Sequence, residues 1–435
     1  MKNKIPENKD KNSRRKFIRN SSLAFAAIHI IPRHVLGRGF TAPSDRIGLG
    51  FIGLGKQSRG LSSSFAKSQD VEIIAGSDVW KTKNDWFKNH VKYQYADRAN
   101  SSSLGNIQTY LNYKELLERK DIDAVVIATP DHWHGIQSVE AMKAGKDIYC
   151  EKPLTHIIKE GREIVDTANK TNRIVQTGSM QRSSNNFRKA CELVRNGYLG
   201  EIKKVLVNVG DPARPYDLPK ETTPNEINWE DWCGPAPLLA YNHRLAPSRN
   251  DVDFWPDWRL FEEVGGGILS DWGAHMFDIA QWGLGMDHSG PVEYIPPTNP
   301  AAVRGLKMYY DNGIEMVHED FGRGWGVRFI GNNGTLDISR SYLDSTPANL
   351  SLTSIKKSDI HLYDSSNHHQ DWLNAIKNRT QPICNAETGH RSATICNIAN
   401  IAYNLKHPLK WDPKKEKFQG DRQANKMRKR VHKKA

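Results

Sequence analysis

The chain has 435 residues and a formal net charge of +13, and this length predicts two globular domains. The positive charge lies at the two ends: residues 1–20 hold eight Lys and Arg against two Asp and Glu, and residues 414–435 hold ten against two. The body of the chain therefore lacks the basic surface of a nucleic-acid-binding protein, and we expect no nucleic-acid partner.

The N-terminal charge precedes a short apolar stretch. Residues 13–18, Ser-Arg-Arg-Lys-Phe-Ile, are followed by the apolar residues Ser22–Ile31. This order is typical of a twin-arginine export signal, although a basic leader without a targeting role is the alternative. The apolar stretch is too short to span a bilayer, so we expect no stable membrane insertion. Residues 1–42 are thus predicted to be a signal and leader, and the protein to be exported to the periplasm.

The first predicted strand, Arg46–Ile52, runs into a glycine turn that opens a helix. Gly53 and Gly55 allow a tight turn and a close approach of the backbone to a pyrophosphate. Ser58 stands where a third glycine would allow close helix packing, and a small serine can partly replace it. The residues of this turn that we assign to cofactor binding are Gly53, Gly55, Lys56, Ser58 and Arg59.

A second strand, residues 71–76, ends at Ser77-Asp78. A carboxylate at this position accepts hydrogen bonds from both ribose hydroxyls of NAD and repels the 2′-phosphate of NADP. We therefore expect the cofactor to be NAD.

A continuous apolar run, residues 124–129, predicts a strand buried on both faces of a parallel sheet. Ligands in such sheets gather at the carboxyl ends of the strands, so Thr129, Pro130 and His134 are cofactor-binding candidates. A capping or packing role is equally open for His134, and His132 is interpreted as structural. A helix over 137–144 and a strand over 146–150 follow, and the strand delivers Glu151-Lys152-Pro153.

The motif Glu151-Lys152-Pro153 and the sequence 265–278, Gly-Gly-Gly-Ile-Leu-Ser-Asp-Trp-Gly-Ala-His-Met-Phe-Asp, resemble two signatures of one family. This is the glucose-fructose oxidoreductase, inositol dehydrogenase and rhizopine-catabolism (Gfo/Idh/MocA) family, and the resemblance covers roughly residues 45 to 412. It implies an α/β fold: an N-terminal Rossmann domain with a doubly wound parallel sheet at 45–154, which binds NAD. A C-terminal α+β domain with a large open, mostly antiparallel sheet is expected at 155–412.

In the second signature, Asp271 and His275 are four residues apart and share one face of the predicted helix. A carboxylate there can orient an imidazole, and oxidation of a secondary alcohol needs a base at the hydroxyl. We expect His275 to be that base and Lys152 to hydrogen-bond the same oxygen, with Glu151 beside the cofactor. The alternative is that Asp271 favours the first turn of the helix and His275 packs.

Between the two signatures, residues 211–263 are rich in proline and tryptophan. Aromatic faces stack on sugar rings, and arginines bind hydroxyls or carboxylates, so this segment suits a carbohydrate site. For any single tryptophan, packing in a loop-rich core is the more common role. The substrate-binding candidates are Arg182, His243, Arg244, Trp258 and Arg259.

The rest of the chain fits the same architecture. Alternating segments near 201–209, 307–310, 314–318, 327–330 and 335–338 predict strands, and 185–196, 369–377 and 389–405 predict helices, the last two packing back on the first domain. Residues 413–435 are interpreted as a basic disordered tail. The five cysteines lack metal-ligand spacing, so no metal is expected, although one disulfide is left open.

Taken together, the motifs predict an NAD-dependent oxidoreductase that acts on a CH–OH group of a sugar, polyol or glycoside. Export implies a tightly bound NAD that is recycled in place, because free NAD is scarce outside the cytoplasm. One alternative is a glycoside-cleaving enzyme that works by transient ketone formation and elimination. Another is a non-catalytic sugar-binding protein. The family resemblance also implies a homo-oligomer, a dimer or tetramer.

Overall fold

The computed structural model describes residues 45–96 and 107–430. The chain divides into two compact units, Met1–Arg46 and Ile47–Ala435, and everything described below lies in the second. The predicted export signal at 1–42 lies outside the described residues. No helix in the described part of the chain is long and apolar enough to cross a bilayer. All five cysteines are buried and free, so the disulfide that the sequence leaves open does not form.

The N-terminal part folds around a six-stranded parallel sheet in the order β3-β2-β1-β4-β5-β6. This is the doubly wound order, in which the chain turns back at the central strand and leaves a crevice at the carboxyl ends. The expected Rossmann fold is therefore confirmed. The strands are β1 (Ile47–Ile52), β2 (Val71–Ser77), β3 (Gln108–Tyr110), β4 (Ala124–Ile127), β5 (Asp147–Cys150) and β6 (Val175–Thr177).

Helices cover both faces of this sheet, and for this reason strands such as β4 are buried along their whole length. The helix after β4 begins directly behind Pro130, six residues before the predicted start at 137, so His132 and His134 lie in its first turn. Asp131 at that end complements the helix dipole. The helices are α3 (Lys56–Phe65), α4 (Lys81–Tyr95), α5 (Tyr113–Glu118), α6 (Asp131–Lys143) and α7 (Ile158–Thr171).

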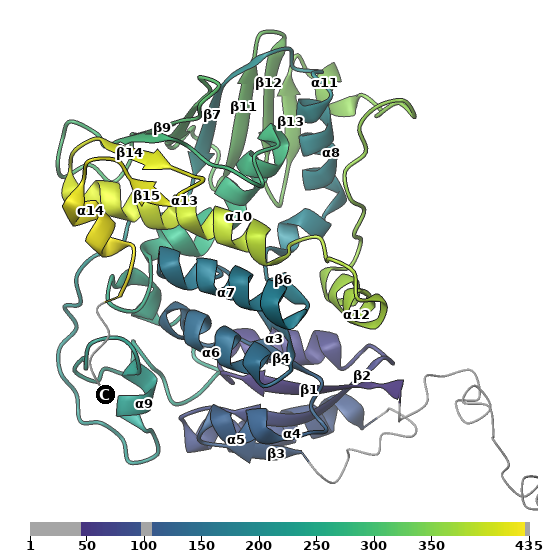
Figure 1. The fold of residues 1–435 in the computed structure, drawn as a ribbon, viewed down its shortest axis with the longest axis vertical. Coiled ribbons are helices and arrows are strands. Elements are labelled where there is room, and N and C mark those ends of the chain that lie inside the picture. The colour runs from purple at the N-terminus through teal and green to yellow at the C-terminus, as the bar shows by residue number, and fades with distance from the viewer. Residues whose placement is uncertain (1–44, 97–106, 431–435) are drawn as a thin grey trace, which may run out of the picture. The chain divides into compact units, whose positions relative to one another are not determined.

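The second sheet has nine strands in the order β13-β12-β11-β7-β10-β9-β8-β14-β15, and its pairs are antiparallel except for β7 with β10. The expected open, mostly antiparallel sheet is thus confirmed (Figure 1). Its strands are β7 (Ile202–Asn208), β8 (Glu293–Ile295), β9 (Leu306–Tyr309), β10 (Glu315–His318), β11 (Gly326–Gly331), β12 (Gly334–Ile338), β13 (Leu343–Thr346), β14 (Leu409–Asp412) and β15 (Lys417–Phe418).

Helices cover one face of this sheet and share a hydrophobic core with it. In this core lie Phe277 from a covering helix and Phe329 from the sheet. Figure 1 shows α8 and α10 against the sheet, and α13 between the sheet and α7. The remaining elements are α8 (Asn185–Arg195), α9 (Trp229–Cys233), α10 (Gly267–Leu284), α11 (Asn349–Leu352), α12 (His368–Asn378), α13 (Ala386–Leu405), α14 (Arg422–Met427), and the 3-10 helices η3 (Met180–Ser183) and η4 (Asp257–Leu260).

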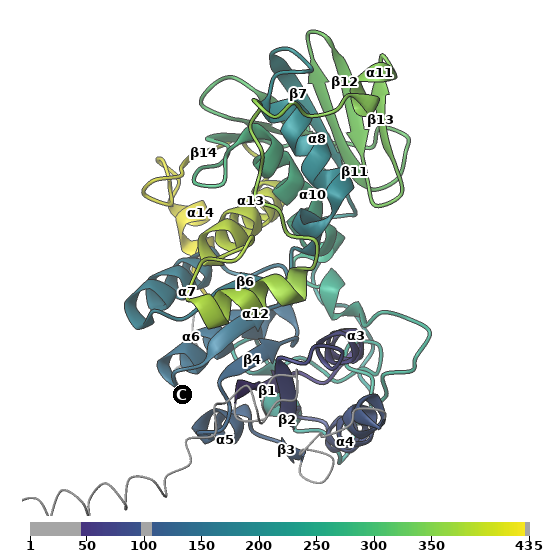
Figure 2. The same cartoon turned by 90° about the vertical axis from the view of Figure 1, so that its right-hand side faces the viewer.

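The nucleotide domain extends beyond the predicted boundary at residue 154. β6 pairs with β5, so the Glu-Lys-Pro loop leaves an interior strand rather than the sheet edge. In addition, α12 lies beside this sheet (Figure 2), where Trp372 packs edge-on against Phe65 at 5.6 Å. A strand before residue 177 was expected from the sequence, but its pairing with β5, which moves the boundary, depends on contacts that the local pattern does not show.

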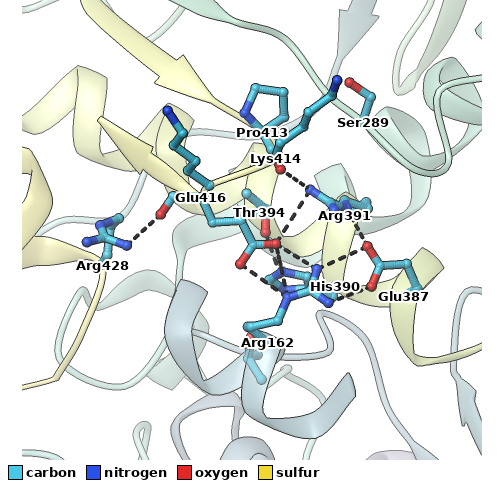
Figure 3. Close-up of polar contacts among 12 residues, drawn as sticks. Arg162, Ser289, Glu387, His390, Arg391, Thr394, Pro413, Lys414, Glu416 and Arg428 are labelled. Atoms are coloured by element: carbon cyan, nitrogen blue, oxygen red, sulfur yellow. Dashed lines mark hydrogen bonds and ion pairs between the residues drawn. The ribbon is translucent and has the colours of Figure 1, made fainter. Parts of the chain in front are cut away.

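The predicted disordered tail at 413–435 is folded as far as Arg430. β15 and α14 lie in this segment, and Glu416 joins a cluster of charged side chains (Figure 3). Its carboxylate accepts hydrogen bonds from Arg162 at 2.7 Å and from His390 at 2.8 Å. Arg430 pairs with Glu160 of α7 at 3.1 Å. The charges that suggested a solvated tail are thus partly used in ion pairs.

Candidate active site

A cavity of about 910 Å³ lies where the carboxyl ends of the parallel strands meet α10. Its lining comes from the glycine turn, the ends of β2, β4 and β5, the first half of α10 and the proline- and tryptophan-rich segment. The predicted site residues that line it are Gly53, Gly55, Lys56, Asp78, Thr129, Pro130, His134, Glu151, Lys152, Trp258, Arg259, Asp271 and His275.

The glycine turn has the geometry that a pyrophosphate requires. Gly53 has a positive φ of 84°, and a Cβ there would lie 2.6 Å from the backbone nitrogen of Thr129. A Cβ on Gly55 would meet nothing within 4 Å, so the backbone in front of α3 is open to a ligand. Ser58 is fully buried and does not line the cavity, which fits its expected packing role. Arg59 is exposed and does not line the cavity, so its predicted cofactor contact stays a prediction.

Asp78 sits at the ribose position of the turn. Its two carboxylate oxygens accept the backbone N–H groups of Leu54 at 2.8 Å and Trp80 at 2.9 Å. Each oxygen keeps a lone pair for a ribose hydroxyl. The buried Lys83 also lines the cavity here, and burial lowers its pKa against the opposing effect of Asp78. Sequence reasoning missed this lysine, since it lies on α4 outside any motif.

Lys152 and Asp271 form an ion pair in the cavity wall. The ammonium of Lys152 lies 2.5 Å from a carboxylate oxygen of Asp271 and also donates to its backbone carbonyl at 2.9 Å. Arg259 lies 3.5 Å from the same carboxylate. Burial opposes the charge, but these two cations lower the pKa of Asp271 to about 2. The carboxylate thus orients Lys152, which corrects the prediction that it orients His275.

His275 is buried, and its Nε2 lies 3.2 Å from the guanidinium of Arg340. Burial, with Lys152 and Arg340 as further causes, lowers the pKa of His275 well below its usual range. The ring is therefore neutral, and because arginine only donates, Nε2 is the unprotonated nitrogen. Nδ1 has no hydrogen-bond partner among the described residues.

Two further carboxyls line the same end of the cavity. Glu151 is buried and accepts from the amide of Gln57 at 3.0 Å, and burial raises its pKa. Asp131 is only 3% exposed, and burial, followed by the charge of Asp271, raises its pKa well above the usual range. Asp131 is the first residue of α6, and from the sequence alone it cannot be told from an acidic residue that only favours the start of a helix.

His134 lies between two backbone carbonyls in the cavity wall. Its ring nitrogens lie 2.9 Å from the oxygen of Pro153 and 3.0 Å from that of Thr129. Burial lowers its pKa to about 4. A neutral ring donates to one of these two carbonyls and packs against the other, so His134 lies between the Glu-Lys-Pro loop and the end of β4, which is the packing role that the sequence left open.

Three predicted substrate contacts lie outside the cavity. Arg182 is 2% exposed and its guanidinium is bonded to Asp278 and Asp287. His243 and Arg244 are largely exposed and pair with carboxylates of their own segment, Glu221 and Asp257 respectively. The structure therefore does not bring these three side chains into the cavity, because carboxylates elsewhere take them up. Trp258 and Arg259 do line the cavity, and the guanidinium stacks on the indole at 4.2 Å.

The proline- and tryptophan-rich segment also reaches over the glycine turn. The side-chain amide of Asn250 donates to the carbonyl of Leu54 at 2.7 Å. Lys56 donates to the carbonyls of Val252 at 2.8 Å and Phe254 at 3.2 Å. We call residues 248–255 the strap. The ammonium of Lys56 thus holds the strap, although it also lines the cavity where we expected it to meet the cofactor.

A doubly wound sheet with an open glycine turn and a carboxylate at the end of β2, joined to a second sheet across a cavity, is the arrangement of a two-domain nucleotide-binding protein. Residues 47–179 match the model of the oxidoreductase family's NAD-binding Rossmann fold, and residues 204–435 match that of its C-terminal alpha/beta domain. The chain therefore belongs to the Gfo/Idh/MocA family, and NAD is its cofactor.

Curated relatives include a "Glycosyl hydrolase family 109 protein" from Shewanella baltica and an "Alpha-N-acetylgalactosaminidase" from Shewanella oneidensis. Each is 30% identical over 191 residues, which is 42% of this chain and 40% of the relative's length.

Similar solved structures include myo-inositol 2-dehydrogenase from Lactobacillus plantarum, with a TM-score of 0.56 and 21% identity. Aldose-aldose oxidoreductase from Caulobacter crescentus has a TM-score of 0.58 and 17% identity. Each alignment covers 84% of this chain and 99% of the other. At these identities the likeness establishes the fold.

Proposed function

We propose that the protein is an NAD-dependent oxidoreductase that oxidises or reduces a secondary hydroxyl of a sugar, polyol or glycoside. The observation that carries this proposal is the meeting of Lys152, Asp271 and the neutral His275 in the cavity that the glycine turn also lines. A hydrogen-bond donor and an unprotonated base beside one another are what alcohol oxidation needs at the hydroxyl.

The chain's own groups divide the work. Lys152, held by Asp271, donates a hydrogen bond to the reacting oxygen and stabilises negative charge on it. His275 is neutral and takes the hydroxyl proton as the C=O bond forms. Bound NAD supplies the acceptor for the hydride that leaves the alcohol carbon. In the reverse direction, His275 returns the proton.

The strap supports a cofactor that stays bound between turnovers. Hydrogen bonds from Asn250 and Lys56 hold it to the glycine turn, where the pyrophosphate binds in this fold. If the cofactor stays bound, its reduced form would have to give the hydride to a second substrate or back to the first. A retained cofactor suits an exported enzyme. Export is favoured by residues 13–18, whose order is typical of a twin-arginine signal.

A second candidate function is glycoside cleavage. A transient ketone would acidify the neighbouring C–H, so that a base removes this proton and the glycosidic substituent leaves as an alcohol. Addition of water to the resulting enone and return of the hydride to the ketone would complete a net hydrolysis with no change in the oxidation state of the cofactor. Similarity to relatives named as family 109 glycosyl hydrolases favours this candidate, but the chain covers only 40% of their length. The presence of Lys152 and Asp271 as an ion pair suits plain oxidation equally.

The test is the absorbance of the purified protein at 340 nm before and after addition of sugars, polyols and glycosides. A rise limited to one equivalent of bound nucleotide supports oxidation with a retained cofactor. Release of a free sugar without a lasting rise favours cleavage. Ligand binding with neither signal, unchanged in Lys152→Ala, would mean a sugar-binding protein and overturn the proposal.

A further inference from the structure

Arg340 is a cation without an acidic partner in the candidate active site. It lies between β12 and β13, lines the cavity, and forms no ion pair with any residue that the structure describes. Its guanidinium stacks 4.5 Å from the ring centre of Trp272 and lies 3.2 Å from Nε2 of His275. With its amide oriented to satisfy both neighbours, Gln181 accepts from Nε of Arg340 at 3.1 Å. These contacts hold the guanidinium beside the reacting groups. They use two of its five N–H donors, so the others remain free for a ligand.

The end of the cavity that holds His275 contains three cationic side chains, those of Lys152, Arg259 and Arg340. The ionised carboxylate of Asp271 lies between Lys152 and Arg259 and serves both. The other two carboxyls there, Glu151 and Asp131, form no ion pair with Arg340, and burial raises the pKa of both. The unpaired guanidinium adds a further cation, so the site favours a ligand that brings a negative charge of its own.

An aromatic surface lies next to this charge. Trp272 and Trp325 both line the cavity, with ring centres 4.4 Å apart, and Trp325 is 41% exposed. Indole faces pack well against the C–H face of a pyranose ring. An arginine fork binds a planar carboxylate through two parallel hydrogen bonds. The arrangement therefore fits a sugar ring that carries a carboxylate.

We propose that Arg340, Trp272 and Trp325 form a subsite for a uronate ring, which makes sugar acids and acidic glycosides the preferred substrates. The proposal rests on the proposed function, because the subsite adjoins the groups assigned there to alcohol oxidation. A carboxylate that binds Arg340 also draws its donor away from Nε2 of His275. The freed lone pair then accepts the hydroxyl proton, so the acid group acts on turnover as well as on binding.

The first experiment measures binding to the NAD-loaded protein by tryptophan fluorescence and calorimetry. The probes are matched pairs of methyl glycosides: glucuronide with glucoside, and galacturonide with galactoside. We expect at least one acid to bind about 10- to 100-fold more tightly than its neutral partner, as a charge-assisted fork contributes. If every neutral glycoside binds as tightly as its acid, the proposal is wrong, whether or not any of them is oxidised.

Variants assign the preference to the subsite. Arg340→Gln should remove the preference for the acid and leave the affinity for the neutral partner within about twofold, while Arg340→Lys should keep part of it. Arg323→Gln is the matched control, since it removes a cation of the same domain that pairs with Asp337 and Asp344 outside the cavity. Equal weakening of acid and neutral ligands in Arg340→Gln would make the guanidinium structural and overturn the proposal.

A separate readout distinguishes this inference from the proposed function. The absorbance at 340 nm reports oxidation, whereas the affinity ratio of each pair reports the subsite. Oxidation of neutral sugars without any preference for acids leaves the proposed function standing and removes the inference. A preference for acids without a rise at 340 nm retains the subsite and removes the proposed function.

Discussion

Asp271 contacts the lysine of the other domain and not the histidine one helical turn away. Spacing along a helix shows which side chains share a face, but the stronger attraction of a buried cation decides which partner a carboxylate takes. Both Lys152 and Arg259 compete for it, which leaves His275 to Arg340.

The first prediction concerns the ion pair. Lys152→Ala should lower kcat by about 10²- to 10⁴-fold, the usual contribution of a positioned proton-transfer or hydrogen-bonding group. Asp271→Asn should cost less, because Lys152 keeps its bond to the backbone carbonyl of residue 271. Single-turnover absorbance at 340 nm measures both. Arg244→Gln, outside the cavity, is the control and should change nothing.

The second prediction concerns the pH dependence of the base. Because burial lowers the pKa of His275 well below its usual range, the imidazole stays unprotonated as the pH falls through 6.5. The oxidation rate should therefore hold down to pH values below 6.5 and decline only at more acid pH. His275→Asn should abolish this acid limb and lower kcat strongly. A rate that halves near pH 6.5 in the unaltered enzyme would contradict the assignment.

At the scale of elements, the strap should slow release of the cofactor. Loss of one hydrogen bond of this kind costs about 0.5–1.5 kcal/mol, so Asn250→Ala should speed NAD dissociation about 2- to 10-fold. Lys56→Met should act in the same direction, since it removes two bonds to the strap. Exchange of bound NAD for a labelled NAD measures the rate. Arg249→Ala, whose exposed side chain pairs within the strap with Asp251, should leave it unchanged.

The folded C-terminal segment gives another prediction. Glu416→Gln removes the anion that Arg162 and His390 share, and should lower the free energy of unfolding by about 2–3 kcal/mol. Thermal unfolding at pH 7 should shift by several degrees. Lys415→Gln, at a side chain that is 78% exposed, is the control. Equal melting of the two variants would show that the cluster does not hold the segment.

Local sequence patterns predicted the helices and strands that carry the motifs. Contacts between side chains that are far apart along the chain could not be predicted from these patterns. The glycine turn and Asp78 could be found because their geometry depends on a few consecutive residues. Arg182 was misassigned because its partner Asp278 lies 96 positions away. Arg340 was missed for the same reason: only the path of the second sheet brings it to His275, 65 positions earlier. Three-residue strands such as β3 and β8 carry too little periodicity to be recognised.

For the whole molecule, buried histidines should set the lower limit of pH stability. Burial lowers the pKa of His132 and His368 to about 3 and of His134 to about 4. Their folded-state pKa values lie below the unfolded value near 6.5, so the unfolded chain binds more protons between these limits. The free energy of unfolding should therefore fall as the pH drops below 6.5, by about 1 kcal/mol per histidine at pH 5.5.

Urea unfolding between pH 8 and pH 5 measures this effect. The denaturation midpoint should be steady above pH 7 and move to lower urea concentration below it. A midpoint independent of pH over that range would show that these rings are not kept neutral by the fold.

β6 lies beside β5 and so fixes Lys152 in the interior of the nucleotide domain, whereas Asp271 and His275 lie on α10 of the other domain. The ion pair between Lys152 and Asp271 therefore connects the nucleotide domain to α10 of the second domain. The proposed hydrogen-bond donor thus comes from one domain and the proposed proton acceptor from the other, so the packing between the domains sets how these two groups lie relative to each other.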